Sequence, residues 1–373
     1  MISSRLLPLV RCPECHAAPS DAGRVWRCPS CGRAFDTAGR HFLDMRPVAT
    51  FAENTKYLDE ALHADARHER VSPPLLAAGV RHWMLRRFLE LDAGDTVVDL
   101  GCGSGRTLWW NRDVGAHLVG VDVSPYFAHE ALDAFDLVLG DLRRLPFRDE
   151  VFTKAWSLDV LEHLSPAALD GMLREASRVL APGGAMFVYT HVRKNSWIAG
   201  GLRAINALAR GLERLGLIDM AQERLRKSDH LNPLADVPHL ERVTAAAGFR
   251  IARVRYYTPL VGGFVENILV RVVERAMARR AAAQLGDRPG TDAAAAGVRE
   301  ARAAAKRRIA GAGPTYLALR LVTWAMRLDV WLFGRIRSGP FFALLVKERD
   351  ASAMAPRAMP ESGGRPPADR AEP

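Results

Sequence analysis

Long hydrophobic runs are absent from this sequence. No uncharged apolar stretch approaches the ~18 residues that a membrane span needs, so a transmembrane helix is not expected. The first residues, MISSRLLPLVRCPEC, hold too short an apolar stretch for a signal peptide, and we expect a cytoplasmic chain. Hydrophobic residues at 49% and charged residues at 25% exclude wholesale disorder and collagen-like structure. The length of 373 residues favours two domains with a small extra module.

Cysteine is also scarce, with five in the chain, and four of these form the knuckles CPEC and CPSC at Cys12, Cys15, Cys28 and Cys31. Two CxxC knuckles at this separation can bring four thiolates around one tetrahedral Zn²⁺. A disulfide framework is the alternative, which a reducing cytosol disfavours. The pattern resembles a zinc ribbon with a structural metal, because four thiolates leave no open position for catalysis. So small a ribbon is expected to depend on its metal and to have a core separate from that of the following module.

Acidic residues are few in the C-terminal half. Residues 190–350 contain 28 Lys and Arg against 14 Asp and Glu, whereas the rest of the chain contains 24 against 28. Such asymmetry indicates contact with an anionic partner: nucleic acid, an acidic membrane surface or a phosphorylated substrate. Solvated helix faces in an arginine-rich protein are the alternative.

From residue 95 onward, short β-branched runs alternate with helical stretches. This alternation predicts an α/β fold with a parallel sheet covered by helices. The expected strands are TVVDL, HLVGVD, DLVLGD, TKAWSLD, AMFVYTH, GFRIARVRYY and FFALLVKE.

A glycine-rich turn follows the first of these strands in VVDLGCGSGR, residues 97–106. Gly101, Gly103 and Gly105 allow the backbone to turn tightly and to approach a ligand closely at a helix N-terminus. The spacing is GxGxG and not GxGxxG, which argues against a dinucleotide such as NAD.

Four aspartates mark the ends of successive expected strands: Asp99, Asp122, Asp141 and Asp159. Open α/β sheets bind their ligands at this edge. A carboxylate at Asp122 can hold the two ribose hydroxyls of a nucleoside, and one at Asp141 can accept from an adenine amino group. Each Asp taken singly could instead be a helix N-cap or a turn residue.

Together, DLGCGSGR, GVDVS, GDLRRLPF, DVLEHL and LAPGG resemble the class I S-adenosylmethionine-dependent methyltransferases, and most closely the group that includes the ubiquinone and menaquinone enzymes. The resemblance implies a Rossmann-like seven-stranded methyltransferase sheet. It further implies that Asp99, Gly101, Cys102, Gly103 and Gly105 line the methionine part of the cofactor. Asp122 would hold the ribose, with Val123 beside the adenine, which Asp141 and Leu142 would bind. Asp159 would lie near the sulfonium and the acceptor.

The resemblance also divides the chain. We expect a zinc ribbon at 1–48, a helical linker at 49–94, the methyltransferase core at 95–256, a helical insertion at 257–339, the last strand of the core at 340–349 and a disordered tail at 350–373. The last strand should lie antiparallel beside the fifth. The insertion departs from the family pattern and is expected to govern access of the acceptor.

Methyl transfer from a sulfonium depends mostly on positioning, and a general base is needed only when the nucleophile starts protonated. His163, after the fourth strand, and His191, after the fifth, are the candidate catalytic residues, followed by Glu162, His230 and Tyr189. His163 could equally be a structural hydrogen-bonding residue at a helix start.

Apolar and aromatic residues share the insertion with arginines: Trp324, Trp331 and Phe333 lie among Arg320, Arg327, Arg335 and Arg337. This pattern is typical of an interfacial helix or of a lid over a lipid-like acceptor. We therefore expect a methyltransferase acting on a small hydrophobic or lipid-linked molecule, with peripheral contact at the inner membrane surface through 257–339. Ordinary packing on the domain is one alternative. An RNA base methyltransferase that grips RNA with its ribbon is the other.

Overall fold

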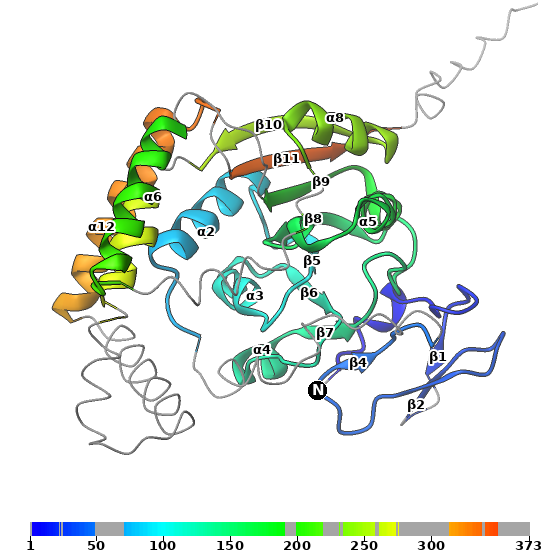
Figure 1. Ribbon diagram of the computed structural model, residues 1–373. Coiled ribbons are helices and arrows are strands. Elements are labelled where there is room, and N and C mark those ends of the chain that lie inside the picture. Colours follow the sequence, from blue (N-terminus) through cyan, green and yellow to red (C-terminus); the bar gives the residue numbers. More distant parts are fainter. Residues whose placement is uncertain are drawn as a thin grey trace, which may run out of the picture.

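The computed structural model describes residues 2–21, 23, 25–48, 71–190, 199–218, 231, 234–257, 261–273, 275, 313–337 and 340–349. Within them, an eight-stranded sheet forms the centre of the molecule (Figure 1). Its strands are β4 (Leu43–Asp44), β5 (Thr96–Leu100), β6 (His117–Asp122), β7 (Asp136–Leu139), β8 (Phe152–Leu158), β9 (Leu180–Thr190), β10 (Phe249–Tyr256) and β11 (Phe341–Lys347).

The strand order is β10-β11-β9-β8-β5-β6-β7-β4. Strands β4 to β9 pair in parallel, whereas β11 runs antiparallel between β9 and β10. This is an α/β Rossmann-like fold, as the alternating pattern predicted. Strand β9 begins at Leu180, earlier than the expected AMFVYTH, and a register shift opposite Phe152 and Lys154 accommodates the Pro-Gly-Gly segment.

Two hydrophobic cores cover the two faces of the sheet. Alternate residues of each strand enter alternate cores: Val98 and Val119 lie in one, Val97 and Leu118 in the other. Helices α5 (Pro166–Val179) and α8 (Val237–Ala246) contribute to the first core. Helices α2 (Leu76–Leu89), α3 (Arg106–Trp110) and α4 (His129–Ala134) contribute to the second. Because both faces are covered, the central strands are hydrophobic throughout, and all six residues of β6 are buried.

The N-terminal module consists of a three-stranded sheet, β1 (Ser20–Asp21), β2 (Val25–Arg27) and β3 (Ala34–Asp36), and of strand β4. Strand β4 joins the central sheet by pairing in parallel with β7, Leu43 opposite Val138. Trp26 and Phe35 belong to the same continuous core as Val98 of the central sheet. The expectation of a separate ribbon core is therefore wrong. The module extends the main sheet and shares its hydrophobic interior.

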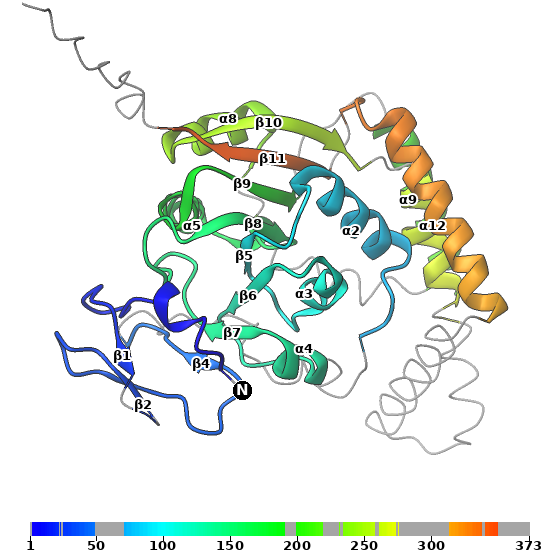
Figure 2. The same ribbon diagram turned by 180° about the vertical axis from the view of Figure 1, so that it is seen from behind.

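Four further elements form a layer that we call the helical cap: α6 (Ala199–Arg214), α9 (Val261–Phe264), the π-helical turn η5 (Val265–Leu269) and α12 (Pro314–Phe333). Helix α12 packs on α2, and both views show it at the flank of the molecule, outside α2 (Figures 1 and 2). No helix in the described part of the chain combines the length and apolarity needed to cross a membrane.

Part of the expected organisation lies outside the described residues. The first half of the predicted helical linker and the predicted disordered tail are among these parts, as are His191 and His230. The domain boundaries therefore stay a prediction, although the strand expected at 340–349 does lie antiparallel to β9, with Phe341 opposite Thr190.

Candidate functional site

The turn between β5 and α3 has the conformation that its glycines suggest. Gly101, Gly103 and Gly105 all have positive φ, at 82°, 53° and 77°. A Cβ at Gly101 would meet Val160 at 2.5 Å and one at Gly105 would meet Ala131 at 2.6 Å, so these two glycines allow close packing. A Cβ at Gly103 would meet nothing within 4 Å. Gly103 therefore faces open space at the carboxyl edge of the sheet, where a ligand could approach the backbone.

Asp99, beside this turn, carries an unsatisfied carboxylate. Its side chain is 2% exposed, and Oδ2 is buried with no hydrogen-bond partner among the described residues. Burial raises the pKa of Asp99 to about 8; the negative charge of Asp122 adds to the rise, and the nearby indole of Trp156 opposes it. The indole nitrogen itself makes no hydrogen bond of acceptable geometry. A buried carboxylate without a partner is suited to accept from a cationic donor of a ligand.

Asp122 connects the end of β6 to the glycine turn. Its Oδ2 accepts from the Gly103 backbone N–H at 2.7 Å, and its Oδ1 accepts from the N–H and hydroxyl of Ser124 at 3.0 and 2.9 Å. The half-buried Val123 follows it. Three of the about four acceptor positions of this carboxylate are thus used within the protein. Ribose hydroxyls would take the remaining position or compete with Ser124.

Asp141 lies two residues beyond the end of β7, beside the half-buried Leu142. Its carboxylate accepts from the guanidinium of Arg143, with a shortest distance of 2.7 Å, and from the Arg143 backbone N–H at 2.8 Å. Asp141 thus stabilises the turn that follows β7, which is the alternative role that the sequence allowed for it.

Asp159 forms an ion pair with Arg81 of α2, a residue that sequence reasoning missed. Asp159 has a φ of 57°, which is uncommon for a residue other than glycine and typical of functional sites. The Arg81 guanidinium lies over the ring of Tyr189, 4.6 Å from its centroid. Burial lowers the pKa of Arg81, but the charge of Asp159, together with smaller contributions from Tyr189, Glu266 and Tyr257, outweighs this effect and raises that pKa. No local motif marks Arg81, because its partners come from β8 and β9.

The general-base candidates divide into buried and partly accessible groups. Glu162 is buried and accepts from the hydroxyl of Thr190 at 2.9 Å. Tyr189 is also buried, and burial raises its pKa well above its ordinary value, so it stays protonated and can donate but not act as a base. His163 is half-buried at the end of the turn η4 (Leu161–His163). His191 and His230 lie outside the described residues.

Cys102 is not suited to be a nucleophile. It is buried, its sulfur lies 2.8 Å from where a Cβ on Gly120 would be, and burial raises the pKa of its thiol well above the usual value, with Asp122 and Asp99 adding to the effect. A thiol that stays protonated acts as a small packing residue beside the glycine turn.

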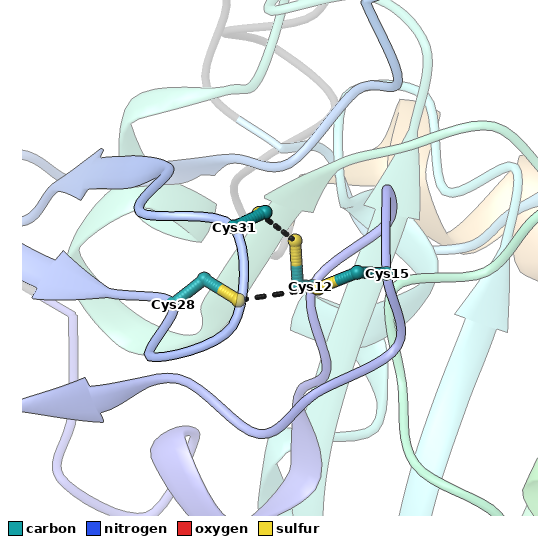
Figure 3. A group of neighbouring side chains, drawn as sticks. All are labelled: Cys12, Cys15, Cys28 and Cys31. Carbon is teal, nitrogen blue, oxygen red and sulfur yellow. Dashed lines mark hydrogen bonds between the residues drawn. The ribbon is translucent and has the colours of Figure 1, made fainter.

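The four knuckle cysteines converge at the edge of the N-terminal module (Figure 3). Their sulfurs all lie within 4.8 Å of one another, with Cys12 to Cys31 at 3.7 Å and Cys15 to Cys28 at 3.3 Å. A tetrahedral site with Zn–S bonds of about 2.3 Å has sulfur–sulfur edges of about 3.8 Å, which is close to these distances. The residues therefore fit a zinc ion with four thiolate ligands.

Comparison with known proteins identifies the central part of the chain. Residues 98–188 match the family described as "Methyltransferase domain". "Methyltransferase GfsG" of Streptomyces halstedii is 31% identical over 162 residues, which cover 38% of this chain and 57% of that protein. "Sterol 4-C-methyltransferase strm-1" of Caenorhabditis elegans is 31% identical over 31% of this chain and 37% of its own length. "Probable tRNA methyltransferase 9B" of Mus musculus is 31% identical over 35% of this chain and 30% of its own length.

Among solved structures, "Haemonchus contortus Phosphoethanolamine N-methyltransferase 2 in complex with S-adenosyl-L-methionine" is 17% identical, with a TM-score of 0.47, and covers 80% of this chain and 59% of that one. The chain thus spans between 30% and 57% of the curated relatives named above. The segment that matches the family, residues 98–188, contains the glycine turn, Asp122, Asp141 and Asp159.

Proposed function

We propose that this chain, whose residues 98–188 match the family described as "Methyltransferase domain", is a class I S-adenosylmethionine-dependent methyltransferase that acts on a small hydrophobic or lipid-linked acceptor. The observation that carries the proposal is the glycine turn at the carboxyl edge of the sheet. There the open backbone at Gly103 and the unsatisfied carboxylate of Asp99 lie next to Asp122.

These residues fit the cofactor. S-Adenosylmethionine, when bound, supplies an electrophilic methyl group on a sulfonium. Asp99, whose raised pKa keeps its carboxyl largely protonated near neutral pH in the ligand-free protein, would lose that proton and accept from the ammonium group of the cofactor, because an incoming cation stabilises the ionised form. Asp122, already bonded to Gly103, would orient the ribose. Gly101, Cys102, Gly105, Val123, Asp141, Leu142 and Asp159 complete the proposed contacts.

The acceptor side lies at the ends of β8 and β9. Arg81 and Asp159 pair there beside the ring of Tyr189, which packs against Tyr257 and Phe342 with ring centroids 6.1 and 4.9 Å apart. The three rings are buried and hold one ion pair at the edge of an apolar cluster, an arrangement that suits an acceptor with an apolar body and a polar end. If the attacking atom starts protonated, His163 and His191 are the proposed bases.

Within the class, we propose that the chain stands nearest the ubiquinone and menaquinone methyltransferases. GDLRRLPF, DVLEHL and LAPGG support this placement. A structural zinc at Cys12, Cys15, Cys28 and Cys31 and a cytoplasmic location peripheral to the inner membrane surface belong to the same proposal.

RNA is the competing acceptor, since one relative is named as a probable tRNA methyltransferase. In this chain, however, the arginines of the helical cap lie among large apolar side chains, whereas RNA-binding surfaces are expected to be polar, basic grooves.

Calorimetric titration of the purified chain with S-adenosylmethionine and, separately, with NAD tests the proposal. We expect one S-adenosylmethionine site per chain and no NAD binding. Binding of NAD alone would refute the class. Incubation with radiolabelled cofactor and either a bacterial lipid extract or total RNA then distinguishes the acceptors, because label in the RNA fraction alone would favour the competing acceptor.

A further inference from the structure

Exposed apolar side chains concentrate in the helical cap. Of the 17 large hydrophobic residues that are exposed in the described part of the chain, 15 lie in or directly beside α6, α9, η5 and α12. Val48 and Leu231 are the other two. Scattered apolar residues are normal on a protein surface, whereas a concentration on one layer marks an interaction site.

Helix α12 presents the clearest part of this surface. Leu317, Leu321, Trp324, Leu328 and Trp331 follow one another at intervals of four and three residues, and all are exposed, with Trp324 at 63% and Trp331 at 64%. Because a helix repeats every 3.6 residues, these five side chains form one stripe about 21 Å long. We call it the α12 stripe.

The opposite side of α12 is already packed. Thr323, Met326 and Val330 are buried, and the Thr323 hydroxyl accepts from the Leu76 N–H of α2 at 2.7 Å. The α12 stripe therefore lies on the side of the helix away from α2. Figures 1 and 2 show α12 itself outside α2, at the flank of the molecule.

The charges around this surface have one sign. In the described part of the cap and in the residues directly after α12, the charged side chains that are exposed are all arginines, namely Arg210, Arg214, Arg320, Arg335 and Arg337. The acidic residues of the same part, Glu213, Glu266 and Asp329, are half-buried or buried. An apolar face with an arginine border is complementary to an anionic lipid surface, in which the apolar residues enter the boundary of the acyl chains and the cations meet the headgroups.

We propose that the helical cap is a docking surface for an anionic lipid bilayer, with α12 lying in the plane of the interface and the α12 stripe facing the lipid. The helix cannot be surrounded by lipid, because its other side packs on α2. The inference rests on the proposed function, since the docking surface is where the enzyme would reach a lipid-linked acceptor in the bilayer.

The packing connects this surface to the site. Arg327 of α12 donates to the Gly79 carbonyl of α2 at 3.1 Å, and two residues later on α2, Arg81 pairs with Asp159. Helix α2 thus contacts the membrane-facing helix on one side and the ends of β8 and β9 on the other. Arg327 itself is half-buried and serves this contact, so the exposed cations to test are Arg320, Arg335 and Arg337.

The test is flotation of the full chain with vesicles of phosphatidylcholine alone and with 30% phosphatidylglycerol added (a composition of about physiological charge). We expect binding that strengthens with the anionic lipid and weakens as salt is raised. The triple variant Leu321→Gln, Trp324→Gln, Trp331→Gln should reduce the bound fraction at least roughly tenfold, because it removes the apolar contribution. The triple variant Arg320→Glu, Arg335→Glu, Arg337→Glu should abolish the preference for anionic lipid.

Matched control variants carry the same kinds of substitution outside the helical cap. Val48→Gln with Leu231→Gln removes exposed apolar residues outside the cap, and Arg5→Glu, Arg242→Glu, Arg250→Glu reverses three exposed arginines outside it. Both should float as the wild type does. Melting temperature and S-adenosylmethionine affinity should stay unchanged in all variants, which separates this inference from the proposed function.

Several outcomes would overturn the inference. They are no binding to any vesicle, equal binding to neutral and anionic vesicles, and wild-type flotation of the α12 stripe variant. A dimer in lipid-free solution that the same variant dissociates would assign the surface to a second copy of the chain. Salt-sensitive RNA binding lost in the arginine variant, without flotation of the wild type, would assign it to RNA.

Discussion

The carboxylates at the edge of the sheet differ in how many hydrogen bonds they already accept within the protein. Asp122 and Asp141 accept hydrogen bonds from Gly103, Ser124 and Arg143, so part of their role is to shape the loops around the site. Asp99 keeps one buried oxygen without a partner in the described structure. The cost of burying that oxygen makes Asp99 the residue whose state should change most when a cationic ligand arrives.

We predict that Asp99→Asn stabilises the ligand-free protein at pH 8 and weakens the binding of S-adenosylmethionine. Burial raises the pKa of Asp99 to about 8 in the folded state, so between about pH 4 and pH 8 the folded protein binds more protons than the unfolded one. Its stability therefore falls as the pH rises through this window, by up to about 1.4 kcal/mol per pH unit. Asn carries no charge and should remove that slope. Urea denaturation of both proteins from pH 5 to pH 8 measures it, and parallel profiles would contradict the assignment.

Asp122→Ala should reduce the affinity for S-adenosylmethionine by about tenfold to a hundredfold, because hydrogen bonds to a charged group contribute about 1.5–3 kcal/mol. The variant removes both the proposed ribose acceptor and the hydrogen bond from the Gly103 N–H. Calorimetry measures the change, with Asp133→Ala, an exposed aspartate, as the control. Unchanged affinity in Asp122→Ala would mean that the end of β6 does not contact the cofactor.

At the scale of elements, the crossing of α2 and α12 determines how the helical cap is held. Gly79 of α2 makes this crossing close: a Cβ there would meet the Pro74 carbonyl oxygen and the Thr323 methyl group, both at 2.7 Å. The Leu76 N–H also donates to Thr323, and the Arg327 guanidinium donates to the Gly79 carbonyl. This one crossing therefore positions both the cap and Arg81.

Gly79→Val should destabilise the protein by about 1–3 kcal/mol, because the Pro74 backbone and the Thr323 side chain would both have to move to accommodate the added atoms. Gly211→Ala is the matched control. Gly211 lies inside α6 with nothing within 4 Å of its Cβ position, so this change should be neutral or stabilise by about 0.5–1 kcal/mol. Chemical denaturation gives both values. Equal effects of the two substitutions would show that the helices do not cross so closely.

For the whole molecule, the N-terminal module and the central sheet form one unit. The Arg11 N–H donates to the Pro146 carbonyl at 3.0 Å and Arg144 donates to the Glu14 carbonyl at 2.9 Å, so the knuckle region contacts the loop that follows Asp141. Strand β4 covers the edge of β7, and Cys12 and Cys28 lie in the shared core. Loss of the proposed zinc should therefore disturb the loop around Asp141, which is the proposed adenine side of the site.

We predict that Cys12→Ser, or removal of zinc by a chelator, lowers the single melting temperature of the whole chain and weakens S-adenosylmethionine binding. Metal analysis should find about one zinc per wild-type chain. Ser4→Ala, an exposed change in the same module outside the knuckles, should alter neither property. Calorimetric scans showing two independent transitions, with cofactor affinity intact, would contradict the shared core.

Local patterns in the sequence are enough to predict most strands, the glycine turn and the cysteine cluster of this protein. Alternating β-branched runs predict seven of the eight strands of the main sheet, because their period and length reflect burial; the eighth, β4, is not expected from them. Glycine spacing predicts the turn at 101–105, and the two CxxC knuckles predict the convergence of four sulfurs, because both depend on residues close in sequence. The expected roles of the aspartates stay predictions, since the structure shows only that these residues lie at the ligand edge.

Only the tertiary structure decided which surfaces pair. Nothing in the sequence around Leu43 and Asp44 indicates that they pair with β7. Likewise, no local pattern distinguishes Arg81 from the other arginines, and only the fold brings it to Asp159. Helix α12 is apolar on several sides, so its sequence could not tell which side packs on α2 and which stays exposed. The physical reason is common to all three cases: an amino-acid pattern specifies the chemistry of a face, whereas its partner comes from a distant part of the chain.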